Sequence, residues 1–158
     1  MRLGIGYDVH QLIEGESLFL GGVEISFHMG LRGHSDADVL LHALIDALLG
    51  ALGKRDIGKL FPDSDEKYKD ISSVILLEKV KTILLEEGYI VNNIDMVVMA
   101  QVPRLAPYAA KIENKISKIL NINKTSINFK ATTTEGLGFI GRKEGISAEV
   151  IVSIMERG

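Results

Sequence analysis

The chain has 158 residues, 46% of them hydrophobic and 25% charged, and its net charge is −3. This length suits one domain spanning 1–158 with a core that needs no disulfide, and the slightly negative charge argues against a nucleic-acid-binding protein. Because there is no cysteine, disulfides and thiolate metal sites are excluded, so a transition metal could be bound only by histidines and carboxylates.

The first expected β-strand covers residues 2–10, where apolar residues alternate with small or polar ones. We expect the apolar set to face the core: Leu3, Ile5, Tyr7 and Val9. Asp8 and His10 then project together from the opposite face, because side chains two residues apart share one side of a strand. The preceding Gly4 and Gly6 leave that face bare, so another backbone or a ligand can approach it closely.

A β-hairpin is expected next, with strands at 18–20 and 23–27. The pair Gly21-Gly22 between them suits a tight turn or a bulge. His28 follows the hairpin and is interpreted as a surface histidine, because no other residue of the pattern pairs with it.

Residues 39–52 are expected to form a helix, which Ser35 or Asp36 could cap. Three polar residues at a spacing of four form a stripe on this otherwise apolar helix: Asp38, His42 and Asp46. One interpretation is the solvated face of an ordinary amphipathic helix. The other is that the helix is buried, in which case its carboxylates and imidazole must be paired or bind a metal.

The rest of the chain alternates helices and strands separated by turn-forming residues. We expect a carboxylate-rich loop at 56–65, helices at 73–87 and 105–120, and strands at 89–101, 127–132 and 145–155. This order predicts a two-layer α+β fold with a mixed sheet and helices on one face. The last strand carries Glu149, Ile151 and Met155 opposite its main apolar set, and such a second, half-apolar face often meets another subunit.

Asp8, His10 and His42 are candidate metal ligands, because one carboxylate and two imidazoles with an open fourth position match a catalytic zinc site. Asp38 and Asp46, one turn either side of His42, could orient its ring for metal binding. The alternative for each residue is ordinary, since single histidines and Asp-x-His pairs are common without any metal.

A second candidate cluster follows the strand at 127–132. It combines hydroxyls, backbone N–H groups, a carboxylate and an arginine: Thr132, Thr133, Thr134, Glu135, Gly136, Phe139 and Arg142. Hydroxyls, N–H groups and arginine bind phosphate oxygens, and a glutamate can bind a hard divalent cation. A simple β-turn after a threonine-rich strand is the alternative. Two cations near phosphates are typical of phosphoryl transfer.

Four separated motifs stand in the order and spacing of a known family: 4–10 (Gly-Ile-Gly-Tyr-Asp-Val-His), 34–39 (His-Ser-Asp-Ala-Asp-Val) with His42, 56–63 (Asp-Ile-Gly-Lys-Leu-Phe-Pro-Asp) and 130–135 (Lys-Ala-Thr-Thr-Thr-Glu). The chain resembles the 2-C-methyl-D-erythritol 2,4-cyclodiphosphate synthases over essentially its whole length. The resemblance implies a CMP-releasing cyclisation of 4-diphosphocytidyl-2-C-methyl-D-erythritol 2-phosphate in the non-mevalonate route to isoprenoid precursors. It also implies that the carboxylate-rich loop, which alone would be a solvated surface, binds substrate.

The resemblance implies zinc on Asp8, His10 and His42, and magnesium or manganese between substrate phosphates, contacted by Glu135. It assigns His34 and Thr133 to transition-state stabilisation. The implied substrate contacts are Asp8, Val9, His10, His34, Ser35, Asp56, Ile57, Gly58, Phe61, Pro62, Asp63, Ser64, Asp65, Ala100, Gln101, Val102, Pro103, Arg104, Leu105, Ala106, Thr132, Thr133, Thr134, Glu135, Phe139 and Arg142. Arg104 stands where some relatives have lysine, which keeps the charge but changes the hydrogen-bonding geometry.

The resemblance further implies a homotrimer with sheets toward its axis, active sites between subunits, and a central channel that can hold an isoprenoid diphosphate near Arg142 and Glu144. No signal peptide or membrane-length apolar run is seen, so a cytoplasmic protein is expected. Two other classes remain open: a zinc hydrolase of phosphate esters, and a non-catalytic trimer that binds isoprenoid diphosphates.

Overall fold

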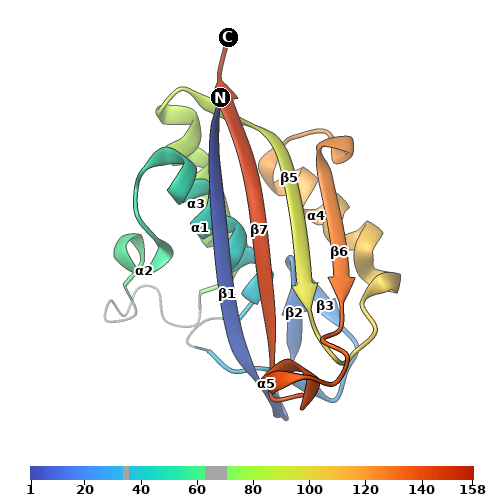
Figure 1. Cartoon of the computed structure of the whole chain (residues 1–158). Coiled ribbons are helices and arrows are strands. Elements are labelled where there is room, and N and C mark those ends of the chain that lie inside the picture. The colour runs from blue at the N-terminus through green and yellow to red at the C-terminus, as the bar shows by residue number, and fades with distance from the viewer. Residues whose placement is uncertain (34–35, 63–70) are drawn as a thin grey trace.

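The computed structural model describes residues 1–33, 36–62 and 71–158. Its main sheet has five strands in the order β4-β1-β7-β5-β6. Figure 1 shows β1, β7, β5 and β6 side by side. These strands are β1 (Arg2–Glu14), β4 (Met29–Leu31), β5 (Tyr89–Met99), β6 (Ile127–Thr132) and β7 (Gly145–Glu156). Only β5 and β6 pair in parallel, so the sheet is mixed, as the sequence predicts. A small hairpin joins β2 (Leu18–Leu20) to β3 (Val23–Ile25) through Gly21 and Gly22, both with positive φ.

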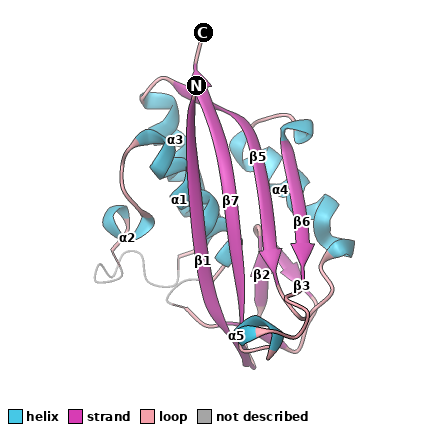
Figure 2. Cartoon of the chain, in the orientation of Figure 1, coloured by secondary structure: helices cyan, strands magenta, loops and turns pink. Residues whose placement is uncertain are grey.

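The larger helices lie on one face of this sheet (Figure 2). The helical segments are α1 (Val39–Leu52), α2 (Ile57–Leu60), α3 (Ser73–Glu86), η2 (Ala106–Tyr108), α4 (Ala109–Leu120), η3 (Lys124–Ser126) and α5 (Gly138–Gly141). The predicted two-layer α+β architecture is therefore confirmed. The loop expected at 56–65 contains a helical turn, α2. No helix within the described ranges has the length and apolar character to cross a membrane, and the expected cytoplasmic location stays a prediction.

Helix α1 packs with its backbone directly against β1. A Cβ atom on Gly6 would lie 1.9 Å from the Ala43 carbonyl oxygen, and one on Gly4 would lie 1.9 Å from that of Ala47. Only glycine allows this approach, because real Cβ atoms do not come so near to another backbone atom. The sequence prediction that these two glycines admit a neighbouring backbone is confirmed.

This packing reverses the predicted orientation of β1. Its apolar set does not face the helices: Leu3 is 67% exposed and Ile5 is 62% exposed. The prediction was wrong because it placed hydrophobic side chains in the core, whereas the glycine face is the one that can accept α1. Across the sheet, Ile5 pairs with Ile151 of β7, which is 49% exposed, so an apolar face of the sheet is left uncovered in the single chain.

The core lies between the sheet and the helices. β7 supplies its predicted apolar face, and these side chains are fully buried: Ala148, Val150, Val152 and Ile154. Helix α1 is buried on nearly all sides, because it packs against β1 and β7 on one side and against α3 on another. The two polar groups in its middle, His42 and Asp46, are therefore only partly exposed, which removes the interpretation of a solvated stripe.

The packing at the glycine face predicts opposite effects from two glycine-to-alanine changes. Gly6→Ala must displace α1, so it should lower the free energy of unfolding by about 2 kcal/mol or more. Gly50→Ala places its Cβ 3.8 Å from the Ile5 carbonyl oxygen, an ordinary contact inside a helix. It should raise stability by about 0.5–1 kcal/mol. Urea unfolding of both variants checks this, and equal effects from the two would contradict the packing described.

Candidate metal centre

Three potential ligand atoms converge between β1 and the start of α1. The Asp8 Oδ2 atom lies 2.9 Å from His10 Nε2 and 3.0 Å from His42 Nδ1. The two ring nitrogens are 3.1 Å apart. Within the described residues these three form the group that could hold a metal ion, so the structure brings together the ligand set predicted from sequence.

Local structure explains why these side chains meet. Asp8 and His10 are two residues apart on β1 and therefore share the glycine face on which α1 lies. His42 is in the second turn of α1 and precedes Ala43, whose carbonyl lies over Gly6. The close helix–strand contact thus fixes the position of His42 along β1, beside Asp8 and His10.

Each histidine is oriented by a hydrogen bond at its other nitrogen. His10 Nδ1 lies 2.9 Å from the Arg32 carbonyl oxygen. Because a carbonyl can only accept, His10 Nδ1 carries a proton and donates it to this oxygen, and Nε2 is the ring nitrogen that faces Asp8. His42 Nε2 lies 2.9 Å from the Ser73 hydroxyl, which leaves Nδ1 on the side of the other two ligands.

The pKa values fit a cation site. Burial favours the neutral form of Asp8, but hydrogen bonds from His10 and His42, together with their charges, prevail and lower its pKa from 3.8 to about 2. Burial also opposes the charged form of His10, yet its hydrogen bond to Asp8 raises the pKa of this imidazole. The site therefore offers a carboxylate to a cation at neutral pH, and metal binding must displace a proton from His10 as pH falls.

The separations of the three donor atoms suit a small transition metal. Tetrahedral bonds of about 2.0–2.1 Å place ligand atoms roughly 3.3 Å apart. The three measured separations, 2.9, 3.0 and 3.1 Å, are slightly shorter, as expected where the ligands bind one another through protons. Nitrogen and oxygen donors with three protein ligands leave a fourth position open for a substrate oxygen.

The prediction that Asp38 and Asp46 orient the ring of His42 is wrong. The Asp38 carboxylate is fully buried and accepts hydrogen bonds from three backbone N–H groups, those of Gly21, Gly22 and Leu41. It is the N-cap of α1, in place of the expected Ser35 or Asp36, and it fixes the β2–β3 turn to the helix. Asp46 accepts from the Ile57 N–H at 2.7 Å and so fixes the start of α2. Backbone N–H groups at a turn and at a helix start attract these carboxylates, which helical spacing alone could not reveal.

The second candidate cluster lies at the ends of the parallel strands β5 and β6. The Ala100 N–H donates to the Thr132 carbonyl oxygen at 2.9 Å, and the Gly136 N–H donates to Gln101 Oε1 at 3.2 Å. The segments 100–106 and 132–135, both predicted to contact substrate, thus lie side by side. Within the cluster, the exposed Thr133 hydroxyl donates to Glu135 Oε1 at 3.2 Å.

The two clusters do not meet within one chain. The register aligns Thr132 at the end of β6 with Val9 of β1, across the intervening β5 and β7. Three strand spacings of about 4.8 Å separate them by roughly 14 Å. Arg142 forms a bidentate ion pair with Glu144, at 2.9 and 3.1 Å. The predicted residues His34, Ser35, Asp63, Ser64 and Asp65 lie outside the described residues.

Two polar residues at the metal centre were not predicted as part of it, Ser73 and Asp36. The Ser73 hydroxyl bridges His42 Nε2 and the Asp36 carboxylate. In sequence each resembles an ordinary helix-capping residue, so no local signal connects them with the histidine. Helical periodicity indicated Asp38 and Asp46 as the partners of His42 instead, because it relates only residues of the same helix.

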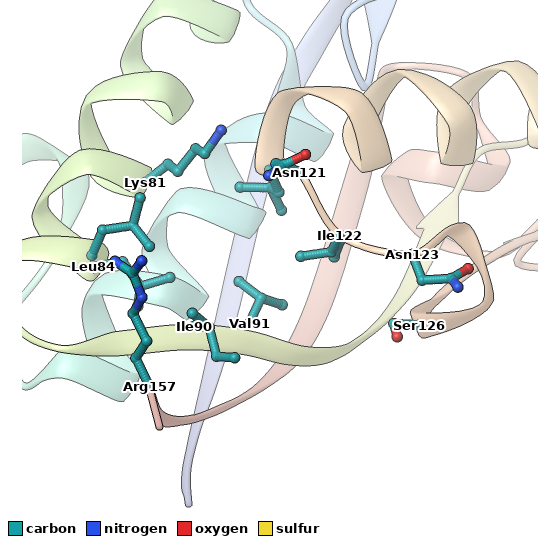
Figure 3. Close-up of a pocket in the computed structure, with 11 residues that line it drawn as sticks. Lys81, Leu84, Ile90, Val91, Asn121, Ile122, Asn123, Ser126 and Arg157 are labelled. Atoms are coloured by element: carbon teal, nitrogen blue, oxygen red, sulfur yellow. The ribbon is translucent and has the colours of Figure 1, made fainter.

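A cavity of 470 Å³ lies away from this centre, between α3, the start of β5 and the end of α4 (Figure 3). Apolar side chains such as Leu84 and Ile122 line it beside Lys81 and Arg157. Ile90 in its wall pairs with residue 155 of β7, whereas Asp8 pairs with residue 148. Seven residues of strand correspond to roughly 23 Å, so this cavity belongs to the other end of the sheet.

The fold and the centre together define an α+β protein with a potential Asp-His-His metal site. A sequence model of the YgbB family matches residues 1–155. The chain is 58% identical over 154 residues to the 2-C-methyl-D-erythritol 2,4-cyclodiphosphate synthase of Alkaliphilus metalliredigens, covering 98% of this chain and 97% of that protein. It is 57% identical over 155 residues to the same-named protein of Caldicellulosiruptor bescii, covering 98% and 99%. The chain belongs to the YgbB family of 2-C-methyl-D-erythritol 2,4-cyclodiphosphate synthases, as its motifs indicate.

Solved structures agree with this assignment. The bifunctional IspDF from Campylobacter jejuni matches with a TM-score of 0.94 and 46% identity, over 98% of this chain and 42% of that longer chain. A CDP complex of IspF from Plasmodium falciparum matches with a TM-score of 0.87 and 36% identity, over 99% of this chain and 97% of that one. The likeness therefore covers both the sequence and the arrangement of its elements.

Replacing Asp38 by asparagine should destabilise the fold. The carboxylate now accepts hydrogen bonds from three backbone N–H groups. The NH₂ group of asparagine would face at least one of these donors and could not accept from it. We expect a loss of about 1–3 kcal/mol in the free energy of unfolding, measured by urea denaturation. Asp95→Asn is the control, because Asp95 forms its bonds at an exposed position; an equal loss there would contradict the capping role of Asp38.

Proposed function

We propose that this chain converts 4-diphosphocytidyl-2-C-methyl-D-erythritol 2-phosphate into 2-C-methyl-D-erythritol 2,4-cyclodiphosphate and CMP, a lyase step of the non-mevalonate isoprenoid route. One observation carries the proposal: Asp8, His10 and His42 place their ligand atoms within 3.1 Å of one another in a chain of this family. A site of this kind matches an intramolecular phosphoryl transfer that needs cations more than it needs a base.

The chemistry requires positioning and charge neutralisation. An oxygen of the 2-phosphate attacks the β-phosphorus, and the bond from that phosphorus to the oxygen bridging the α-phosphorus breaks. The bridging oxygen leaves with CMP, and no water is consumed. Because the nucleophile is already anionic, the protein must hold attacking and leaving oxygens in line and balance the negative charges.

The residues present fit the two cations that the family implies. Asp8, His10 and His42 would hold zinc, and Glu135 would contact magnesium or manganese. When bound, these ions polarise phosphate oxygens and neutralise charge that develops during transfer. The Thr133 hydroxyl beside Glu135 can donate to a phosphate oxygen, and we assign it and His34 to stabilising the transition state.

The remaining predicted contacts divide into two groups. The segment 56–58 begins at Asp56, which caps α2, and would bind the methylerythritol part together with 61–65. The joined segments 100–106 and 132–135 would bind the cytidine and diphosphate part. Their position at the carboxyl ends of parallel strands favours this, because ligands commonly bind at such ends.

A homotrimer would complete the site. In one chain, Val9 stands between the metal ligands Asp8 and His10, Thr132 stands next to Thr133, and roughly 14 Å separates Val9 from Thr132, which supports a site shared by neighbouring subunits. The uncovered apolar face around Ile5 and Ile151 is the surface that would pack at the trimer axis. A channel there could accept an isoprenoid diphosphate near Arg142 and Glu144. Native mass spectrometry tests the trimer, and a monomer at micromolar concentration would contradict it.

Incubation with the diphosphocytidyl substrate, zinc and magnesium in ¹⁸O-labelled water tests the proposed reaction. We expect CMP and the cyclic diphosphate, with no ¹⁸O in either product, because the attacking oxygen comes from the substrate. Mass spectrometry of the products checks this. Incorporation of ¹⁸O into a product phosphate would instead support a zinc hydrolase, and binding without CMP release would support the non-catalytic class.

Replacing one ligand at each proposed site should show that the two cations bind at different residues. His42→Ala should lose bound zinc and at least a thousandfold in turnover, because two ligands hold the ion poorly. Glu135→Gln should keep its zinc but require more magnesium for half-maximal activity. Elemental analysis and magnesium titrations provide the measurements. Full zinc content in His42→Ala, or an unchanged titration for Glu135→Gln, would count against the respective assignment.

A further inference from the structure

Ser73 and Asp36 form a buried connection to the metal centre from outside it. The Ser73 side chain is fully buried at the start of α3, and its hydroxyl lies 2.9 Å from His42 Nε2. The same hydroxyl donates to Asp36 Oδ1. The connection is long in sequence, since 31 residues separate Ser73 from His42 and 37 separate it from Asp36.

The hydrogen-bond donors in this connection can be assigned. A carboxylate only accepts, so the single proton of the Ser73 hydroxyl points to Asp36. The hydroxyl oxygen must then accept from His42, which means that His42 Nε2 carries the proton. Nδ1 then carries a lone pair that can accept from His10 Nε2 at 3.1 Å, and it lies 3.0 Å from Asp8 Oδ2.

Asp36 is itself held in place by α3. Its Oδ2 atom accepts from the Ser73 N–H at 2.9 Å and from the Ser72 hydroxyl at 3.1 Å. The first N–H groups of a helix favour a negative charge, so α3 stabilises Asp36 as the carboxylate that the assignment requires. The two oxygens of Asp36 have different partners. Oδ2 accepts from the start of α3, and Oδ1 accepts from the Ser73 hydroxyl and so orients it.

We propose that Ser73 and Asp36 are positioning residues that select the tautomer and ring orientation of His42 for metal binding. The proposal rests on the proposed metal site. An oriented imidazole binds a metal more tightly than one that must rotate or shift its proton first, and loss of such a partner typically lowers affinity 10–100-fold.

Ser73→Ala tests this in two independent ways. In the zinc-free protein, ¹⁵N–¹H NMR of the imidazoles should show His42 protonated at Nε2 in the wild type and a mixture of tautomers in the variant. In the second measurement, zinc affinity from competition with a chelating dye should fall 10–100-fold. Wild-type protein that binds no zinc would overturn the proposed metal site, whereas the NMR result tests the positioning role without any metal.

Two other serine changes are the controls. Ser72→Ala removes the side-chain cap of α3 and one donor to Asp36, but not the contact with His42. It should lower stability by about 1 kcal/mol and leave zinc affinity within about threefold. Ser153→Ala removes a buried hydroxyl that Asn92 contacts on β7, and should leave both His42 signals and zinc affinity unchanged.

Unchanged His42 tautomer and zinc affinity in a folded Ser73→Ala variant would overturn the proposal, as would an equal loss in Ser72→Ala. If Ser73→Ala does not fold, Asp36→Asn is measured instead, since it keeps an acceptor for the hydroxyl but loses the charge. A roughly tenfold loss of zinc affinity then supports the positioning role, and an unchanged affinity overturns it.

Discussion

The contact of the α1 backbone with the glycine face of β1 is the constraint on which the rest of the structure depends. At Gly4 and Gly6 the helix lies too close for any side chain. Since Asp8 and His10 continue this face, the same contact delivers His42 to them. The metal centre is therefore a direct extension of the packing between one strand and one helix.

That contact also has a cost, which explains the apolar outer face of the sheet. Once the glycine face accepts the helix, the alternating side chains of β1 must point away from the core. Ile5 and its neighbour Ile151 remain exposed in the single chain. An exposed apolar sheet face stabilises association with another protein surface, and it is consistent with the subunit contacts that the proposed function requires.

The polar groups of the buried α1 are satisfied in three different ways. Asp38 accepts hydrogen bonds from the backbone of the β2–β3 turn, and Asp46 accepts one from the first N–H of α2. His42 contacts the other two metal ligands and Ser73. Burial makes each connection valuable, because an unpaired polar group in the interior would be costly. Through these bonds α1 organises the elements around it as well as the core.

The sequence by itself determined the α+β class, most helix and strand positions, the family, and the set Asp8, His10 and His42, because periodicity and motif spacing are local properties of the chain. The tertiary structure alone decided which face of β1 is buried, since steric access for α1 outweighed hydrophobicity there. It also decided the partners of His42. Ser73 and Asp36 reach the histidine through space, whereas Asp38 and Asp46, its neighbours along the helix, bind backbone N–H groups of other elements.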